Sequence, residues 1–354
     1  MNDKIEFSEL IVDNSTTLMD AMRKMDEIGG KLLMVLDGLK FVSLISLGDI
    51  QRAIINNIDL NSSVSIISRE INVVGSLENS IDEIKQIMLS IRAEFLPVID
   101  SKKNIVKIYY WNDLFDTTSI VKKKMLTNNV VIMAGGFGTR VQPLTNVIPK
   151  PLLPVNGRSF LEEIIHRFSA YSINNYYISI NYKAELIKFY INNLNLPFNI
   201  SFFSETTPRG TIGGVVGLKG KFNEPFFVSN CDILIDADYS EIVNFHTINK
   251  FDITLVAAVM TNRSEYGTLI TGDNGELLSL EEKPQHNYKI NTGMYLIEPK
   301  LIDLIPSEGL FHVTDLIDLV RNRGGKIGVF PISEKSWRDF GTLSAYINQT
   351  IKHS

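Results

Sequence analysis

The sequence predicts an α/β protein in two parts, a repeated α+β module followed by a larger domain with a mixed, mainly parallel sheet. Over roughly the first 120 residues, the order helix–strand–strand–helix occurs twice. From Asn129 onward, short apolar runs alternate with helical segments, which is typical of βα units. Hydrophobic residues make up 44% of the 354 residues and charged residues 21%, as in a protein with a well-formed core.

Charge and cysteine content exclude several classes of protein. With 35 Lys and Arg against 40 Asp and Glu, there is no basic excess, so we expect no nucleic-acid partner. A single cysteine, Cys231, excludes a disulfide framework, and the five histidines are too scattered for a histidine-ligated metal. No apolar run approaches the ~18 residues of a membrane span, and the acidic N-terminus lacks a signal peptide's apolar core. We therefore expect a cytoplasmic protein without membrane contact.

The repeat is defined by helix caps and turns. The polar cluster Asn14–Thr17 is a good N-cap for a helix that Gly29-Gly30 would end. Asp37-Gly38 is a typical hairpin turn between two apolar strands. The first copy is expected to contain strands at 31–36 and 41–45 and a helix at 46–54, and the second copy a helix at 80–89, strands at 95–99 and 105–110, and a helix from Asn112.

This repeat, over about Ile5–Ser119, resembles a tandem CBS pair (a Bateman module). In that family a Ser/Thr-x-x-Asp motif after the last strand holds the ribose of an adenine nucleotide. Ser46 and Asp49 fit the motif, whereas the second copy has Tyr110 in place of the hydroxyl residue. The resemblance implies an adenine nucleotide at Ser46 and Asp49. The alternative is a dimerisation scaffold that binds no ligand.

We place the module at residues 1–120, a linker at 121–128 around the lysine run 122–124, and the larger domain at 129–354. Ser159 and Glu162 form a capping box that opens a helix with an apolar face. The remaining expected elements are strands at 129–133, 176–180, 199–203, 224–229 and 253–260, and helices at 184–192 and 241–249.

The strongest chemical signal is the segment GGFGTRVQPLTNVIPKPLLPV, residues 135–155, directly after the first strand of this domain. Three glycines let the loop turn its backbone N–H groups inward as an anion cradle. The prolines that follow keep the chain extended and direct Lys150 toward the cradle. A glycine-rich loop with a forked cation, Arg140, and a point cation, Lys150, suits a triphosphate.

This segment resembles the signature of the sugar-1-phosphate nucleotidyltransferases, and the resemblance covers about Asn129–Asn348. It implies a Rossmann-like, GT-A-like fold, with Arg140 on the departing phosphates and Lys150 on the α-phosphate. In that family a sugar phosphate attacks the α-phosphorus of a nucleoside triphosphate and pyrophosphate leaves. The loop residues expected to bind the nucleotide are Ala134, Gly135, Gly136, Gly138, Thr139 and Arg140.

An anionic nucleophile that attacks an anionic phosphorus needs charge neutralisation, so we expect Mg²⁺, which prefers carboxylate oxygens. The expected metal ligands are Asp232, at the end of a strand, and Asp339, in a segment that resembles the family's second metal-aspartate motif. The family usually has Gly before the first aspartate. Here Cys231 stands there, and we expect it to be a packed residue, not a nucleophile.

The resemblance also assigns the sugar phosphate and the base. The residues expected to bind the sugar phosphate are Tyr266, Gly267, Glu282, Lys283, Asn291 and Thr292, although Tyr266 and Asn291 could equally be a packed ring and a turn residue. The base is expected at a segment that contains Glu205, Gly210, Thr211 and Gly213, whose glycines would admit a flat ring. A carboxylate only accepts hydrogen bonds, so Glu205 favours guanine, which offers two adjacent donors.

With its CBS-like module, the chain looks like the CBS-bearing glucosamine-1-phosphate guanylyltransferases of bacterial legionaminic acid biosynthesis. The mannose-1-phosphate guanylyltransferases are the next group that it resembles. GTP, glucosamine 1-phosphate and a homo-oligomer (dimer or tetramer) are the implied partners. Two alternatives remain: the same enzyme with dTTP, UTP or CTP, or a nucleotide-sensing regulator whose transferase domain is inactive.

Overall fold

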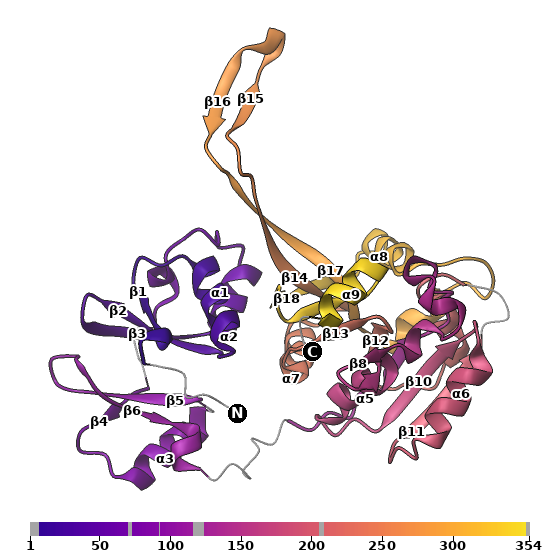
Figure 1. Ribbon diagram of the computed structural model, residues 1–354, viewed down its shortest axis with the longest axis horizontal. Coiled ribbons are helices and arrows are strands. Elements are labelled where there is room, and N and C mark those ends of the chain that lie inside the picture. The colour runs from indigo at the N-terminus through magenta and orange to yellow at the C-terminus, as the bar shows by residue number, and fades with distance from the viewer. Residues whose placement is uncertain (1–6, 70–72, 92, 116–123, 205–208, 352–354) are drawn as a thin grey trace. The chain divides into compact units, whose positions relative to one another are not determined.

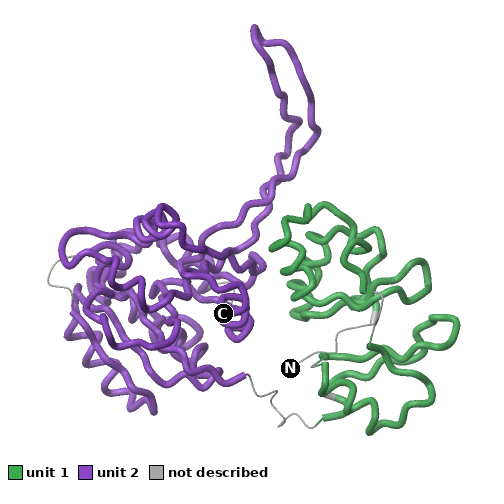
Figure 2. Tube along the Cα trace, turned by 180° about the vertical axis from the view of Figure 1, so that it is seen from behind, with its two compact units in different colours: residues 1–122 green, residues 123–354 purple. Residues whose placement is uncertain are grey.

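A computed structural model describes residues 7–69, 73–91, 93–115, 124–204 and 209–351. The chain forms two compact units, residues 1–122 and 123–354 (Figure 2). Within the described ranges, no helix is long and apolar enough to cross a membrane.

The first unit repeats one arrangement, a parallel strand pair with a helix between them, followed by an antiparallel hairpin and a short helix. Its elements are η1 (Phe7–Leu10), β1 (Ile11–Asp13), α1 (Leu18–Ile28), β2 (Leu32–Asp37), β3 (Lys40–Ser46), α2 (Leu47–Ile55), η2 (Val64–Ile67), β4 (Gly75–Ser76), α3 (Ile81–Ile91), β5 (Phe95–Ile99), β6 (Ile105–Tyr110) and α4 (Trp111–Leu114). The sheets have the orders β1-β2-β3 and β4-β5-β6. The predicted order of elements is therefore confirmed in both copies, and the short strands β1 and β4 are additional.

The predicted caps explain where the first helix begins and ends. The Thr17 side chain accepts a hydrogen bond from the Asp20 N–H, and Gly29 closes the helix at φ 65°, a conformation that favours glycine. The two copies share a core, because Phe95 of the second packs in one buried cluster with Met34 and Phe41 of the first. The two copies therefore form one packed unit.

The second unit is built on a seven-stranded sheet with the order β11-β10-β7-β12-β17-β14-β18. Its strands are β7 (Val130–Met133), β10 (Asn175–Ile180), β11 (Asn199–Ser204), β12 (Phe226–Asn230), β14 (Ile253–Arg263), β17 (Gln285–Ile297) and β18 (Ile327–Ser333). Strand β17 is antiparallel to both of its neighbours, and the other pairings are parallel. The predicted mixed, mainly parallel sheet is confirmed.

Helices cover both faces of this sheet (Figure 1). Val130 and Ile132 of β7 belong to one buried cluster and Val131 to the other. Successive side chains of a strand point to opposite faces of the sheet, so a strand covered on both faces contributes to both clusters. The first face packs against α5 (Phe160–Ser169), α6 (Ala184–Asn193), α7 (Tyr239–Asn249) and α9 (Leu343–Ile351), and the second against η6 (Gly213–Leu218), η8 (Pro299–Leu304) and α8 (Val313–Asn322). The predicted capping box of Ser159 and Glu162 opens α5.

Strand order identifies where this unit would bind a ligand. After β7 the chain moves to β10 and β11 on one side, and it returns to β12 on the other side. In open α/β sheets, the crevice outside the carboxyl ends of such strands is the usual ligand site. The glycine-rich loop after β7 and Asp232 after β12 both lie at this edge.

A two-stranded arm continues from the long strands β14 and β17 and projects from the sheet (Figure 1). The β14–β17 ladder extends to Arg263 opposite Gln285, and the arm consists of β15 (Thr268–Thr271) and β16 (Leu277–Glu281). Leu269 and Leu280 face each other across the arm and are both about 60% exposed.

Candidate active site

The glycine-rich loop is held by Thr145. Gly138 has φ 67°, and a Cβ atom there would lie 2.9 Å from Thr145 Cγ2 and 3.2 Å from Lys150 Cβ. The buried Thr145 hydroxyl donates to the Gly138 carbonyl oxygen at 2.8 Å. Gly138 is therefore required by its backbone conformation and by the close approach of the segment that carries Lys150. We did not single out Thr145 from the sequence, although it stands in the same signature.

Lys150 contacts both the glycine-rich loop, at Gly138, and Asp232, which follows β12. It begins η5 (Lys150–Leu152), and its ammonium donates to Asp232 Oδ2 at 2.5 Å and to the Gly341 carbonyl oxygen at 3.4 Å. Its side chain is only 8% exposed and that of Asp232 only 15%. The two side chains therefore compensate each other's charge away from water, and removing either partner would leave a poorly solvated charge.

The two predicted metal ligands lie on neighbouring rungs of a short ladder. β13 (Ile233–Ile235) pairs antiparallel with β19 (Trp337–Asp339), which places Asp339 opposite Ile233. The Phe340 N–H donates to the Asp232 carbonyl oxygen at 2.9 Å. The Asp339 carboxylate accepts from the Gly341 N–H at 2.8 Å.

The chemistry of the Asp232 carboxylate suits a Mg²⁺ ion that retains most of its water, with Asp339 as the predicted second ligand. In the described part of the chain, no group of three or more His, Cys, Asp or Glu residues could form a complete protein cage for a metal. Mg²⁺ needs no such cage, because it usually takes one or two carboxylates and fills its octahedron with water and substrate phosphates. In the ligand-free protein, the Lys150 ammonium is the cation paired with Asp232.

Cys231 does not have the properties of a nucleophile. It is buried beside Asp232, and burial together with that negative charge raises the pKa of its thiol to about 12. The protonated thiol is a poor nucleophile at neutral pH. This agrees with the expectation that Cys231 is a packed residue.

Arg140 and the loop backbone are open to solvent. Arg140 lies in η3 (Thr139–Val141), and its side chain is exposed. A Cβ atom added at Gly136 would meet nothing within 4 Å, whereas one at Gly135 would approach Ser179 and Asn181. Ala134 is buried and Thr139 is exposed. The loop therefore offers an accessible cation and accessible backbone next to Gly138, which Lys150 contacts.

Gly210 and Gly213, the glycines predicted to admit the base, both lie against Phe311. At Gly210, φ is 84°, and a Cβ atom would lie 2.5 Å from the Phe311 carbonyl oxygen. At Gly213 the closest atoms belong to Arg209 and Phe311. Thr211 accepts a hydrogen bond from the Val313 N–H at 2.9 Å. Gly210, Thr211 and Gly213 thus contact the segment around Phe311 and Val313, and Glu205 lies outside the described residues.

The predicted sugar-phosphate residues fall into two groups, and only one lies near Asp232. Asn291 donates to the Tyr295 hydroxyl and accepts from the Gly293 N–H, while Gly293 closely approaches Asn230 at the end of β12. The buried Thr292 hydroxyl donates to the Val256 carbonyl oxygen, so Thr292 fixes the strand.

The second group lies at the base of the arm. Tyr266, Gly267, Glu282 and Lys283 are all exposed. Gly267 faces Glu282, because a Cβ atom at Gly267 would lie 2.8 Å from Glu282 Oε2. Lys283 lies two residues before β17 and eight residues before Asn291, and a fully extended chain of that length spans roughly 26 Å. The structure therefore does not bring this group to the Lys150–Asp232 pair.

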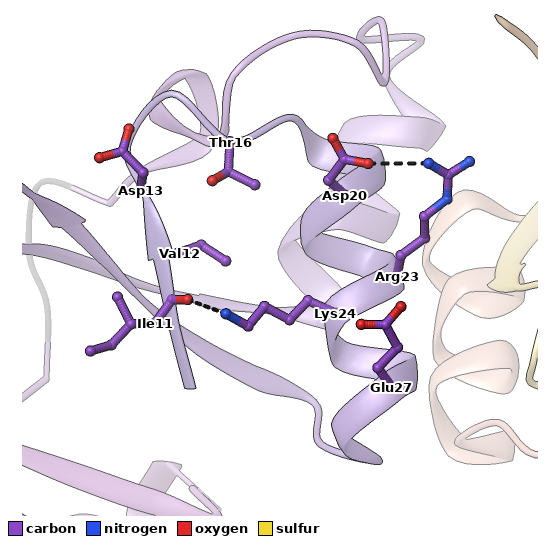
Figure 3. A pocket seen from close by; sticks show the side chains of 8 residues that line it. All are labelled: Ile11, Val12, Asp13, Thr16, Asp20, Arg23, Lys24 and Glu27. Atoms are coloured by element: carbon purple, nitrogen blue, oxygen red, sulfur yellow. Dashed lines mark hydrogen bonds and ion pairs between the residues drawn. The ribbon is translucent and has the colours of Figure 1, made fainter. Parts of the chain in front are cut away.

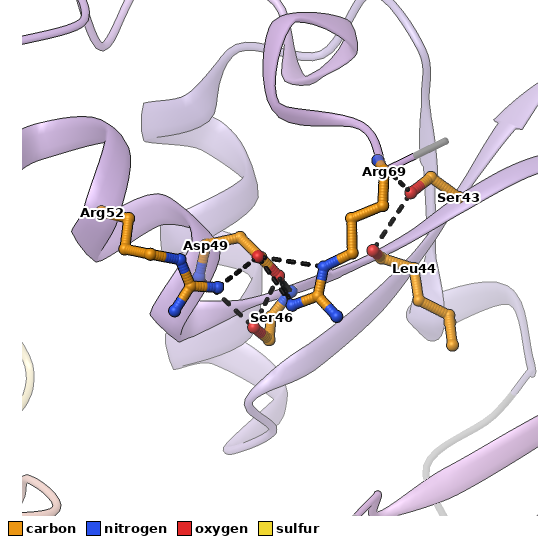
Figure 4. A network of polar contacts seen from close by, with 6 residues as sticks. All are labelled: Ser43, Leu44, Ser46, Asp49, Arg52 and Arg69. Carbon is orange, nitrogen blue, oxygen red and sulfur yellow. Dashed lines mark hydrogen bonds and ion pairs between the residues drawn. The ribbon is translucent and has the colours of Figure 1, made fainter. Parts of the chain in front are cut away.

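In the first unit, Ser46 and Asp49 lie together but their polar atoms are already engaged. Asp49 accepts from Ser46, from Arg52 and, through both oxygens, from Arg69 (Figure 4). Burial alone would raise the pKa of Asp49, but the hydrogen bonds from Ser46, Arg69 and Arg52 outweigh it and lower the pKa. Asp49 lines a cavity of about 240 Å³ whose other walls include Leu32, Leu44, Val73 and Ile91.

A second cavity, of about 480 Å³, lies between β1 and α1. Lys24 crosses it to donate to the Ile11 carbonyl oxygen, and Asp20 pairs with Arg23 at its rim (Figure 3). Lys24, Asp20 and Arg23 are therefore engaged in contacts within the first unit.

Comparison with known proteins identifies the family of the second unit. The Nucleotidyl transferase family matches residues 129–353, which is more than half of the chain. The chain therefore belongs to the nucleotidyl transferase family.

Two curated relatives illustrate the similarity. Mannose-1-phosphate guanylyltransferase of Mycobacterium tuberculosis is 30% identical over 230 residues, which cover 63% of this chain and 64% of that protein. The bifunctional protein GlmU of Methanococcus aeolicus is 33% identical over 224 residues, which cover 60% of this chain and 51% of that protein. This chain thus spans about half to two thirds of the length of these relatives.

Among solved structures, HddC of Yersinia pseudotuberculosis superimposes with a TM-score of 0.51 at 25% identity, covering 64% of this chain and all of that one. The expected Rossmann-like nucleotidyltransferase fold is confirmed by this likeness and by the family match.

Proposed function

We propose that the chain transfers a nucleoside monophosphate from a nucleoside triphosphate to a sugar 1-phosphate. One observation carries the proposal: Lys150, held against the glycine-rich loop, is paired with Asp232 across the switch point of the sheet. A cradle for phosphates, a buried cation and a carboxylate for a divalent metal are what an in-line displacement at the α-phosphorus requires.

In the proposed reaction, an oxygen of the sugar phosphate forms a bond to the α-phosphorus. The bond from that phosphorus to the bridging oxygen of the β-phosphate breaks, and pyrophosphate leaves with the electron pair. The loop backbone and the exposed Arg140 would bind the departing phosphates, and Lys150 would neutralise the α-phosphate. Mg²⁺, held by Asp232 and Asp339, would supply further charge neutralisation when bound.

The sugar 1-phosphate would bind at Asn291 and at the arm residues Tyr266, Gly267, Glu282 and Lys283, with Lys283 on its phosphate. Lys283 adopts the left-handed backbone conformation, with φ 48°. Because the structure does not bring the arm residues to the Lys150–Asp232 pair, this role requires the arm to approach that pair when substrate binds.

For the substrates, we propose GTP and glucosamine 1-phosphate, with mannose 1-phosphate as the alternative. The guanine preference rests on Glu205 and is supported by the name of the mycobacterial relative, a mannose-1-phosphate guanylyltransferase. If Glu205 reads the base, Glu205→Gln should shift preference away from GTP, and an unchanged preference in nucleotide competition would remove Glu205 from base recognition.

We propose that residues 1–120 are a CBS module joined by a linker at 121–128 to a catalytic domain at 129–354. The repeated architecture and the cavity beside Asp49 support this proposal. An adenine nucleotide at Asp49 would have to displace Arg69, so binding is expected to disturb the Arg69–Asp49 pair. Calorimetric titration with AMP and ATP would test it, and the absence of binding would favour a scaffold role.

We also propose a homo-oligomer, a dimer or tetramer. Isolated two-stranded ribbons are marginal in water, and the apolar side chains on the arm would be stabilised by a partner. Light scattering on the full chain gives the oligomeric state directly.

The decisive test of the function is pyrophosphate release with Mg²⁺, GTP, dTTP, UTP and CTP in turn, each with a panel of sugar 1-phosphates. We expect release that depends on both substrates and is fastest with GTP. No release with any pair would favour the remaining alternative, a nucleotide-sensing regulator with an inactive transferase domain.

A further inference from the structure

Asp232 has two roles that compete. It is the best placed carboxylate for a divalent metal, and it is also the partner of Lys150 at 2.5 Å. A divalent cation bound directly to the same carboxylate would stand beside the ammonium and repel it, and the low exposure of both side chains weakens the screening of that repulsion.

Lys150 has few other places to go in the ligand-free protein. Its second contact is a carbonyl oxygen, that of Gly341, which carries no formal charge. Its Cβ atom lies against Gly138, so the base of the side chain is fixed by the glycine-rich loop. A new anion in the crevice can draw the ammonium away from Asp232 without leaving the lysine charge uncompensated.

We propose that the Lys150–Asp232 ion pair keeps the metal site closed until a nucleotide phosphate takes Lys150. In the nucleotide-free enzyme the ammonium occupies the place of a divalent ion on Asp232. A triphosphate gives Lys150 an anionic partner and frees the carboxylate, so the metal binds together with the nucleotide and not before it. This inference rests on the proposed function, because it assumes that the crevice receives a phosphate-bearing substrate.

The test measures divalent-ion binding without any nucleotide. Mn²⁺, used in place of Mg²⁺, is titrated into the full chain and the free ion is followed by electron paramagnetic resonance. We expect weak binding by the wild type and at least tenfold tighter binding by Lys150→Met, in which the side chain keeps its length but not its charge. Lys150→Gln, which retains a hydrogen-bond donor, should also gain affinity and serves if Lys150→Met does not fold.

Two controls separate the ion pair from a general charge effect. Lys188→Met removes a lysine from an i,i+3 pair with an exposed glutamate and should leave Mn²⁺ affinity unchanged. Adding Asp232→Asn to Lys150→Met should abolish the gain, because the gain depends on the freed carboxylate.

Equal Mn²⁺ affinity in the wild type and in the folded Lys150 variants would overturn the inference. So would a gain that survives in the double variant. The pyrophosphate assay distinguishes this failure from failure of the proposed function. An active wild type whose Lys150 variants gain no affinity refutes only the closed metal site, whereas an inactive wild type whose variants gain affinity refutes only the proposed reaction.

Discussion

Gly138→Ala tests whether the glycine-rich loop positions Lys150. The new Cβ atom would lie 2.9 Å from Thr145 Cγ2 and 3.2 Å from Lys150 Cβ, in a residue held at φ 67°. The left-handed conformation costs an L-residue about 1–2 kcal/mol, and overpacking adds about 1–3 kcal/mol. The protein can relieve the overlap only by moving the segment that carries Thr145 and Lys150.

Because a displacement of about 1 Å in an active site can lower turnover about 10²-fold, we expect a loss of kcat of that order in pyrophosphate release. Gly157→Ala is the matched control, since Gly157 also has a positive φ, 77°, but a Cβ atom there would meet nothing within 4 Å. The Gly157→Ala variant should be destabilised only by the cost of the left-handed backbone conformation, and its kcat should equal that of the wild type. A Gly138→Ala enzyme with wild-type kcat would refute the reasoning.

Three further predictions follow from other contacts. Lys283→Ala should raise the KM for sugar 1-phosphate about tenfold or more and leave the KM for the nucleotide nearly unchanged; equal effects on both would remove Lys283 from the sugar site. Burial lowers the pKa of His246, so below about pH 6.5 the unfolded chain takes up a proton that the folded chain refuses. The free energy of unfolding should therefore decrease as the pH is lowered below that value, by at most about 1.4 kcal/mol per pH unit. His246→Gln should reduce this pH dependence in denaturation experiments. Arg69→Met should destabilise the first unit by about 1–2 kcal/mol, whereas Arg23→Met, which removes an exposed i,i+3 pair, should cost less than about 0.5 kcal/mol in thermal unfolding.

Most of the fold could be predicted from the sequence because its signals are local. The Thr17 cap, the Gly29 terminus and the Ser159–Glu162 capping box each act within a few residues, and each occurs where it was expected. The strands at 95–99 and 105–110 match the predicted bounds. The two-residue strand β4 was missed because it is too short to show a periodic pattern.

Contacts between distant segments could not be predicted. Lys150 and Asp232 are 82 residues apart, and nothing local indicates that they form an ion pair. Arg69 lies 20 residues after Asp49 and carries no motif that would show that it occupies both carboxylate oxygens. Nothing local in the sequence indicates that the Phe311 backbone lies against Gly210, 101 residues earlier.

The central claim is that the Lys150–Asp232 site transfers a nucleoside monophosphate to a sugar 1-phosphate. Phosphorus NMR of a reaction with Mg²⁺, GTP and glucosamine 1-phosphate tests it most directly, with wild type and Asp232→Asn compared. Asparagine is preferable to alanine at this position, because it retains an acceptor for the buried Lys150 ammonium. We predict equal amounts of pyrophosphate and nucleotide sugar from the wild type, and at least a 10³-fold slower reaction from folded Asp232→Asn, about 4 kcal/mol in activation free energy. A folded Asp232→Asn enzyme that forms both products at the wild-type rate would contradict the account.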